Sequence, residues 1–348
     1  MSSSSSSSRF AAFLAQKREQ LAATSPAAPT AEQQFRERCA RYRAERLAPD
    51  IERIRSSSAG GGGGSPRPLR VALLFLVMDR PQDHEPLWRR WLRDASPDVV
   101  CADVFIHSKR CDGRRYRGSS SSFFHAHLAR DFHRTPGWGT PELTETMLLL
   151  ALEARRARGG GGYDHYVFLS EACIPTRPLE AFARELRASG GDSWLRRSAQ
   201  AEDGYAQSGQ FEPLAAWFPE TCIRKSDQWV QLSATHLELL RALARFLRED
   251  AKEETDTPAE DAADARALLA PFAHVRASDE MFFATYLTLL EPAASGISER
   301  RMTTVCWLVG EAHPHTFTSI RAALRFAAEQ PPPACMFVRK VCITAPRS

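Results

Sequence analysis

The sequence lacks the features that identify several common classes of protein. Its 46 Lys and Arg residues nearly balance 42 Asp and Glu residues, so the formal net charge is only +4. That charge gives little support for nucleic-acid binding, which needs a concentrated basic surface. The eight cysteines include no C-x-x-C pair, which argues against a zinc site. Their even number fits either disulfides or buried thiols, and composition does not choose between them.

Several catalytic motifs are also missing. The chain has no P-loop and no G-x-G-x-x-G after a strand, which disfavours kinases, GTPases and Rossmann oxidoreductases. Ser170 lacks the flanking glycines of a nucleophile elbow, which disfavours a hydrolase triad. No Asp-x-Asp occurs, although metal-dependent nucleotide-sugar transferases generally hold a divalent cation with such paired carboxylates. A transferase of that kind built on this chain would need cationic side chains in place of the metal.

Long apolar runs are absent as well. The first residues, MSSSSSSSRFAAFLAQKREQ, contain no apolar stretch long enough for a signal peptide. The strongest apolar run, residues 69–78, is about half the length that a membrane span requires. We therefore expect neither a signal peptide nor a transmembrane anchor in this sequence.

Residues 1–65 and 66–348 differ in composition. The first segment is low in complexity, with serine and glycine tracts around an Arg- and Glu-rich helix at 32–55. That helix carries a thin apolar stripe (Phe35, Cys39, Tyr42 and Leu47), so it is either a solvated stalk or a docking helix, and we favour the stalk. Residues 66–348 are predicted to form the folded domain.

The folded domain alternates apolar runs with amphipathic segments, which predicts an α/β fold with a mixed sheet flanked by helices. Ser278 is expected to cap a helix, and the acidic, Ala-rich residues 250–271 are expected to form a solvated insertion. We expect strands at 69–77, 99–107, 166–169, 192–196, 302–310 and 335–341, and helices near 87–92 and at 141–158, 179–188, 233–249, 278–290 and 320–329.

Glu171 directly follows the buried strand at 166–169, and Pro175 prevents that strand from continuing. In an open α/β sheet, the carboxyl ends of strands face the ligand crevice. Glu171 therefore lies at the mouth of a site, unless it only caps the turn.

Two further charged positions have both structural and functional interpretations. Glu280 is either a first-turn charge that stabilises its helix or a general base at the crevice. Arg339 and Lys340 follow an apolar strand, where they either protect a sheet edge or bind a diphosphate. His313 and His315 flank Pro314 without a neighbouring cysteine or acidic cluster, so metal binding is the weaker interpretation.

Several blocks of the sequence carry a resemblance. Across most of residues 69–342 they are ALLFLV with PLWRRWL, VFIHSK, WGTPELTETMLLLALE, YVFLSEACIP, RKSDQWVQLS, SDEMFFATYL, TVCWLVGEAHPHTF and CMFVRKV. Together, in this order, they resemble the Core-2/I-branching enzyme family (glycosyltransferase family 14), especially its plant and algal branch. The resemblance implies a GT-A-like fold and an inverting, metal-independent transferase that uses UDP-sugars. It also implies a Golgi location, although no anchor is visible here.

The resemblance also assigns roles to residues of this chain. It implies that Glu280 is the catalytic base and that Lys340 binds the diphosphate, with Arg321 the best candidate for a second cation. The remaining expected site residues are Arg339, His107, Ser108, Trp138 and Glu171 on the nucleotide side, and Trp229, Trp307 and His313 on the sugar side.

Our prediction is therefore a glycosyltransferase that moves a sugar, N-acetylglucosamine in our first assignment, from a UDP-sugar to a hydroxyl of a glycan or glycoconjugate. We expect no resident cofactor, no metal and no nucleic-acid partner, and membrane association only by resemblance. The alternative is a non-catalytic relative that keeps the fold and binds carbohydrate or nucleotide-sugar.

Overall fold

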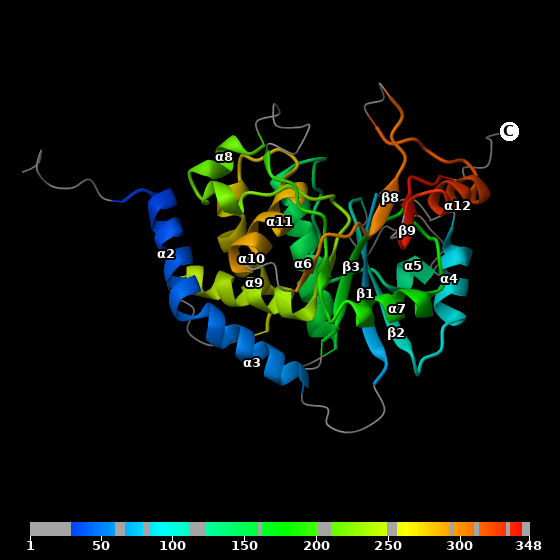
Figure 1. Cartoon of the computed structure of the whole chain (residues 1–348), viewed down its shortest axis with the longest axis horizontal. Coiled ribbons are helices and arrows are strands. Elements are labelled where there is room, and N and C mark those ends of the chain that lie inside the picture. Colours follow the sequence, from blue (N-terminus) through cyan, green and yellow to red (C-terminus); the bar gives the residue numbers. More distant parts are fainter. Residues whose placement is uncertain are drawn as a thin grey trace, which may run out of the picture.

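The computed structural model has one central sheet with helices on both faces and a smaller sheet beside it (Figure 1). The residues that it describes are 29–59, 67–78, 84–110, 123–158, 162–200, 210–248, 256–291, 296–309, 313–331 and 335–342.

The large sheet has six strands in the order β2-β1-β3-β6-β5-β7. β1, β2 and β3 are parallel, whereas β6 is antiparallel to both β3 and β5, so the sheet is mixed as predicted. β1 is apolar along nearly its whole length because both of its faces are covered by other elements. The strands are β1 (Leu69–Val77), β2 (Val100–Ser108), β3 (His165–Ser170), β5 (Ser193–Trp194), β6 (Gln231–Ser233) and β7 (Ile297–Ser298).

A second sheet of three strands was not predicted. Its order is β4-β9-β8, with β9 antiparallel to β4 and parallel to β8. It consists of β4 (Ile174–Pro175), β8 (Thr303–Val305) and β9 (Phe337–Arg339), so the strand expected at 302–310 is shorter than predicted. Because β4 begins shortly after β3 ends, β9 returns the C-terminal residues to the end of β3.

Helices cover the two faces of the large sheet separately. Leu74 and Phe168 face a core formed with α6, α9, α10 and α11, whereas Phe75 and Val167 face a core formed with α4 and α7. The helices are α2 (Ala31–Glu45), α3 (Leu47–Ala59), α4 (Glu85–Arg93), α5 (Phe123–Ala126), α6 (Pro141–Ala157), α7 (Leu179–Ala188), α8 (Glu212–Ala215), α9 (Ala234–Leu247), α10 (Pro258–Leu269), α11 (Ser278–Leu290) and α12 (Ile320–Ala328), with 3-10 turns η4 (Glu220–Cys222) and η5 (Ala270–Phe272).

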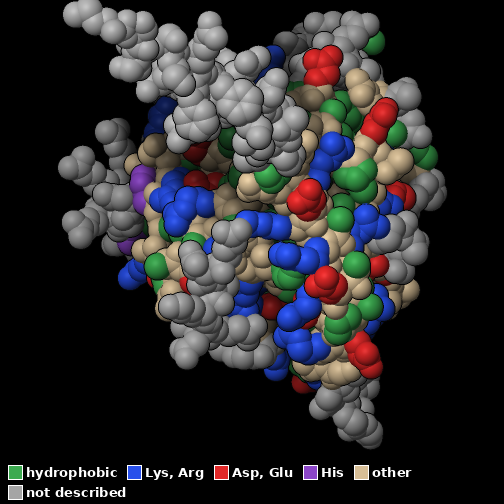
Figure 2. All heavy atoms as spheres, turned by 90° about the vertical axis from the view of Figure 1, so that its left-hand side faces the viewer, with side chains coloured by type: hydrophobic (Ala, Val, Ile, Leu, Met, Phe, Trp, Pro, Cys, Tyr) green, Lys and Arg blue, Asp and Glu red, His purple; other side chains and the backbone are tan. Residues whose placement is uncertain are grey.

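The N-terminal helices are docked, and the stalk interpretation of residues 32–55 is wrong. Phe35 packs edge-on against Trp217 and Phe218, with ring centroids 5.4 Å apart in both pairs. Tyr42 is buried, and its hydroxyl donates to Asp50 Oδ2 at 3.0 Å. The predicted apolar stripe is buried, because all four of its residues (Phe35, Cys39, Tyr42 and Leu47) join the core around α9. Figure 2, which views this side of the molecule, shows basic and acidic side chains mixed over its outer surface.

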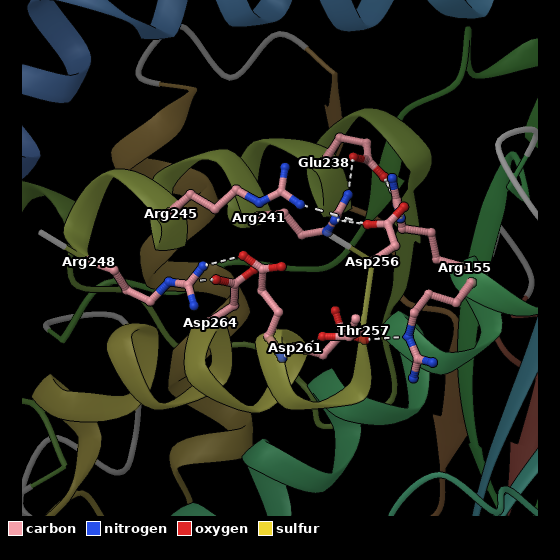
Figure 3. A network of polar contacts seen from close by, with 11 residues as sticks. Arg155, Glu238, Arg241, Arg245, Arg248, Asp256, Thr257, Asp261 and Asp264 are labelled. Carbon is pink, nitrogen blue, oxygen red and sulfur yellow. Dashed lines mark hydrogen bonds and ion pairs between the residues drawn. The ribbon is translucent and has the colours of Figure 1, made fainter. Parts of the chain in front are cut away.

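The described part of the acidic segment is also docked, which corrects the expectation of a solvated insertion. α10 lies against α6 and α9, and its carboxylates face arginines of those helices (Figure 3). Asp261 Oδ2 lies 2.6 Å from Arg156 Nε, and Asp264 Oδ1 lies 3.1 Å from Arg248 Nε. The local sequence could not predict this arrangement, because the partner of Asp261, Arg156, lies 105 residues earlier in the chain.

Candidate active site

The carboxyl ends of the three parallel strands lie along one edge of the large sheet. In the strand register, Leu76 of β1 lies opposite both His107 of β2 and Ser170 of β3. Ser108 is the last residue of β2, and Glu171 directly follows β3. The predicted residues at the ends of β2 and β3 therefore share one edge, with β1 between them.

The C-terminal strand brings two cations to this edge. Arg339 Nε donates to Ser170 Oγ at 3.2 Å. Burial raises the pKa of the Glu171 carboxyl, while its own backbone N–H and the charges of Arg339 and Lys340 oppose that rise. Glu171, Arg339 and Lys340 thus form one electrostatic cluster, although they are far apart in the sequence.

Trp229 joins this cluster through its ring. The Arg339 guanidinium carbon lies 5.1 Å from the ring centroid, which is a cation–π distance. Trp229 is buried, and its Nε1 has no hydrogen-bond partner among the described residues. The next residue, Val230, accepts a hydrogen bond from the Phe168 N–H at 3.0 Å, which holds this segment along β3. Arg339 therefore covers part of the ring that we expected a sugar to contact.

Glu280 lies in the first turn of α11, whose start is held by main-chain contacts. Ala277 has φ 51°, a left-handed conformation that is rare for residues other than glycine, and its N–H donates to the Gly139 carbonyl at 2.7 Å. Ala277 therefore holds the N-cap position that we predicted for Ser278. Ser278 is instead the first helical residue, and its hydroxyl bonds that of Thr144 at 2.6 Å. These contacts fix the direction in which α11 presents Glu280.

Lys225 pairs with Glu280 from the opposite side. Its Nζ lies 3.3 Å from Glu280 Oε2, and the Glu280 side chain is 33% exposed. Lys225 and Trp229 lie in the same segment before β6, and Trp229 contacts Arg339. This segment therefore connects the first turn of α11 with the cations at the end of β3.

Asp279 is buried behind this pair. Burial, and then the adjacent charge of Glu280, raise its pKa to about 7, while Lys225 and the backbone oppose the rise. Its Oδ1 has no hydrogen-bond partner among the described residues. The first turn of α11 thus holds two neighbouring carboxyl groups, of which one is buried and the other half-exposed.

Trp138 lies close to the start of α11 and is 74% exposed. The Arg276 guanidinium carbon is 5.7 Å from its ring centroid, and Gly139, the next residue, bonds Ala277. Trp138, predicted on the nucleotide side, thus lies beside the start of α11, the helix that carries Glu280.

His107 is a buried, neutral histidine. Its Nε2 accepts a hydrogen bond from the Arg134 N–H at 3.3 Å, and its ring stacks on Phe132 with centroids 5.4 Å apart. Burial, and then the charge of His133, lower its pKa to about 4. His107 therefore supports the end of β2, and Ser108 holds Met78 through a hydrogen bond from Oγ to the carbonyl at 3.0 Å.

The remaining predicted residues lie after β8. Trp307 is 55% exposed, and His313 is also exposed. Arg321 is exposed in the first turn of α12, and no contact between described residues joins it to Glu171 or Lys340. α12 itself packs against β9, and Phe317, just before α12, donates its N–H to the Lys340 carbonyl at 2.8 Å.

Three residues of this region were not predicted: Lys225, Arg276 and Asp279. Lys225 stands in the block RKSDQWVQLS and Asp279 in SDEMFFATYL, so the blocks that carry the family resemblance already contained them. Their roles were missed because the Lys225–Glu280 pair joins positions far apart in the chain. The spacing of residues within one segment does not indicate such a contact.

The cysteines that the structure describes are free thiols, which resolves the open alternative for those seven. Cys111, the eighth, lies outside the described residues. Within the described ranges, no three His, Cys, Asp or Glu side chains are grouped so that they could hold a metal ion.

A cavity of about 550 Å³ lies at the other, amino-terminal edge of the sheet. Asp164, Arg187 and His236 are among its lining residues, and none of the predicted site residues line it. His236 is buried, and its Nδ1 lies 2.7 Å from Ser193 Oγ. Burial lowers the pKa of His236 to about 3, so this histidine is a neutral part of the core.

The family model for the Core-2/I-Branching enzyme matches residues 71–327, which include Glu171, Lys225 and Glu280 but end before Arg339. No curated protein matches the chain. Within the described part, no helix is both long and apolar enough to cross a membrane. The mixed sheet flanked by helices agrees with the GT-A-like fold that we predicted. Because the match spans more than half of the sequence, the chain belongs to the Core-2/I-branching enzyme family of glycosyltransferases.

Proposed function

We propose that this glycosyltransferase is an inverting, metal-independent enzyme that transfers a sugar from a UDP-sugar to a hydroxyl of a glycan or glycoconjugate. N-acetylglucosamine is the sugar we propose first. The observation that carries the proposal is the arrangement around the segment before β6. Lys225 of this segment pairs with the half-exposed Glu280, and Trp229 of the same segment contacts Arg339. The segment before β6 thus contacts the Glu280 carboxylate through Lys225 and the cation Arg339, next to Lys340, through Trp229.

The proposed reaction is a single in-line displacement at the anomeric carbon. The acceptor oxygen forms a bond to this carbon as the bond to the β-phosphate oxygen breaks. The acceptor proton passes to the Glu280 carboxylate, and the electron pair of the broken bond leaves with UDP. A positioned base contributes about 10²–10⁴-fold to such a step. One displacement inverts the configuration, so no covalent intermediate on the protein is required.

Lys340 and Arg339 are the proposed partners of the departing diphosphate. Negative charge grows on the leaving phosphate oxygens in the transition state, and fixed cations stabilise it more than they stabilise the ground state. Lys340 follows β9 directly, and hydrogen bonds from the N–H groups of Phe317 and Val341 hold the carbonyls of Lys340 and Ala172. These cations replace the divalent metal in our proposal. Arg321 stays a weaker candidate because it is exposed and lies on α12.

We place the acceptor beside α11 and the nucleotide along the ends of β2 and β3. Trp138 offers an exposed ring on the Glu280 side, and aromatic rings suit the apolar faces of sugars. His107, Ser108 and Glu171 stay our proposed residues on the nucleotide side. Trp229, Trp307 and His313 stay proposed sugar contacts, although Arg339 already covers part of Trp229. A Golgi location and membership of the plant and algal branch are carried over from the resemblance as parts of the proposal.

The alternative function is a non-catalytic relative that binds sugar or nucleotide-sugar. The Lys225–Glu280 pair weighs against it, because a binding protein has no need of a held, half-exposed carboxylate at this position. UDP binding without transfer across a broad acceptor panel would favour the alternative.

The experiment that tests the proposal is a transfer assay with purified protein. UDP release is measured for a panel of UDP-sugars and glycan acceptors, with and without EDTA, and the anomeric configuration of the product is determined by NMR. We expect an inverted product and full activity in EDTA. Loss of activity in EDTA that added Mn²⁺ restores would overturn the metal-independent mechanism, and a retained configuration would overturn the single displacement.

A further inference from the structure

Lys225 pairs with Glu280, but the proposed reaction gives it no step of its own. We propose that Lys225 is a positioning residue, which fixes the Glu280 carboxylate and keeps it ionised. This inference rests on the proposed function of Glu280 as the catalytic base. Neither the family match nor the resemblance assigns a role to this lysine.

The main chain around Lys225 is held on both sides. Lys225 and Ser198 form a two-way bridge, in which each N–H donates to the carbonyl of the other at 2.9 and 2.8 Å. The next residue, Ser226, donates its N–H to the Glu280 carbonyl at 2.7 Å, and its Oγ donates to the same carbonyl at 3.3 Å. The lysine backbone is therefore attached directly to the first turn of α11.

The side chain of Lys225 is confined as well. Only 9% of it is exposed, compared with 33% of the Glu280 side chain. A lysine normally loses much side-chain entropy when it is held in one geometry, and here packing has already removed that freedom. The ammonium at 3.3 Å from Oε2 therefore restrains the carboxylate, while the exposed part of Glu280 stays open to an acceptor.

The neighbouring Asp279 is not a competing charge where Glu280 titrates. It is buried, and burial and then the adjacent charge of Glu280 raise its pKa to about 7, so its carboxyl is protonated at lower pH. Other charged groups on the segments around this turn include Arg224, Arg276 and Asp227. The Arg224 guanidinium donates to the Ile223 carbonyl at 2.8 Å, and Asp227 pairs with Arg301 Nε at 3.1 Å. Lys225 is a cation that the structure places against Glu280 itself, 3.3 Å from its Oε2.

The arrangement predicts different effects for two neutral variants. Removal of the cation in Lys225→Met disfavours the ionised form of Glu280, so the base is lost at a higher pH. Asp279 is already protonated at the pH where a glutamate titrates, so Asp279→Asn should leave the titration of the base unchanged. A charge at this separation shifts a carboxyl pKa by roughly one unit or more.

The test is the pH dependence of kcat/KM, whose acidic limb reports the essential base of the free enzyme. We expect this limb to move up by about one pH unit in Lys225→Met, to return toward the wild-type position in Lys225→Arg, and to stay in place in Asp279→Asn. Arg43→Met, on the exposed face of α2, is the matched control that removes a distant cation. UDP affinity, measured by calorimetry, should stay within about twofold of wild type in all of these variants.

The outcomes separate this inference from the function on which it rests. If Glu280→Gln is inactive but Lys225→Met keeps the wild-type limb, the positioning role is wrong and the base assignment stands. If Glu280→Gln keeps full activity, the base assignment itself is wrong. A general structural role for Lys225 would lower activity equally at every pH, and this result would also overturn the inference. Should Lys225→Met fail to fold, Lys225→Gln removes the same charge and decides the question.

Discussion

Two regions of this molecule are rich in charge, and they use it differently. Between α6, α9 and α10, arginines and carboxylates pair repeatedly: Arg241 contacts both Glu238 and Asp256, at 2.9 and 2.6 Å (Figure 3). At the strand ends, Glu280 and Lys225 meet at 3.3 Å, and one third of the carboxylate side chain stays exposed. The first region has the dense, short contacts of a structural network. The second keeps part of its carboxylate accessible, as a reacting group requires.

The largest expected effect is a loss of turnover, without a loss of stability, when Glu280 is replaced. Glu280→Gln keeps the size of the side chain and removes the proton acceptor, so kcat should fall by about 10²–10⁴-fold. The free energy of unfolding, measured with urea, should change by less than about 1 kcal/mol because the side chain is partly exposed. Glu37→Gln, on the exposed face of α2, is the control and should leave both quantities unchanged.

A Lys340 variant tests whether the cations of the site, like Glu280, act in turnover rather than in stability. Lys340→Met should lower kcat by about 10²-fold, because the charge that develops on the leaving diphosphate loses a fixed partner. UDP binding, measured by calorimetry, should weaken as well, whereas the melting temperature should stay close to wild type. Unchanged UDP affinity together with normal kcat would remove Lys340 from the site.

Asp261 should show the reverse pattern. It is buried, and its Oδ2 lies 2.6 Å from Arg156 Nε, so Asp261→Ala leaves a largely buried guanidinium with one partner fewer. We expect a loss of about 2 kcal/mol in the free energy of unfolding. At temperatures where the variant is folded, kcat should equal that of wild type. A drop in kcat without loss of stability would show that the α6–α10 network contributes to the reaction.

The smallest expected effect concerns pH and stability at Asp279. Its pKa of about 7 in the folded protein is higher than that of an unfolded aspartate, about 3.9, so the folded state binds more protons between these values. Its contribution to stability is therefore full below about pH 4 and is lost as the pH rises through 7. Asp279→Asn should gain stability relative to wild type at pH 8 compared with pH 5, measured by urea unfolding. An equal difference at both pH values would contradict the raised pKa.

Local sequence patterns predicted the main elements of the fold because those elements depend on local signals. The run at 69–77 is apolar throughout and forms β1 at those residues, and α7 occupies the predicted residues 179–188. Contacts between distant segments were not predicted. The docking of α10 depends on arginines of α6 and α9, and the small sheet depends on pairing between Ile174 and Val338.

The same distinction applies to the site. Glu171 was expected at a strand end because parallel strands share an edge, and the structure has it there. The family resemblance, rather than any local pattern, singled out Glu280 and Lys340. Lys225 was missed because its contact with Glu280 joins positions that are distant in the chain. The position of Trp138 beside α11 was also not predicted, because the hydrogen bond from the Ala277 N–H to the Gly139 carbonyl cannot be read from either segment alone.

The hydrogen bond between Gly139 and Ala277 has a consequence for how specificity could diverge in this family. Ala277 adopts a left-handed conformation, and its N–H is held by the Gly139 carbonyl at 2.7 Å, next to the exposed ring of Trp138. The distance from that ring to the helix of Glu280 is therefore set by main-chain atoms, which side-chain substitution does not remove. Under the proposed function, replacement of Trp138 would change which acceptor is recognised while Glu280 keeps its place. Acceptor recognition and catalysis could then change independently, because the two residues are connected through a main-chain hydrogen bond.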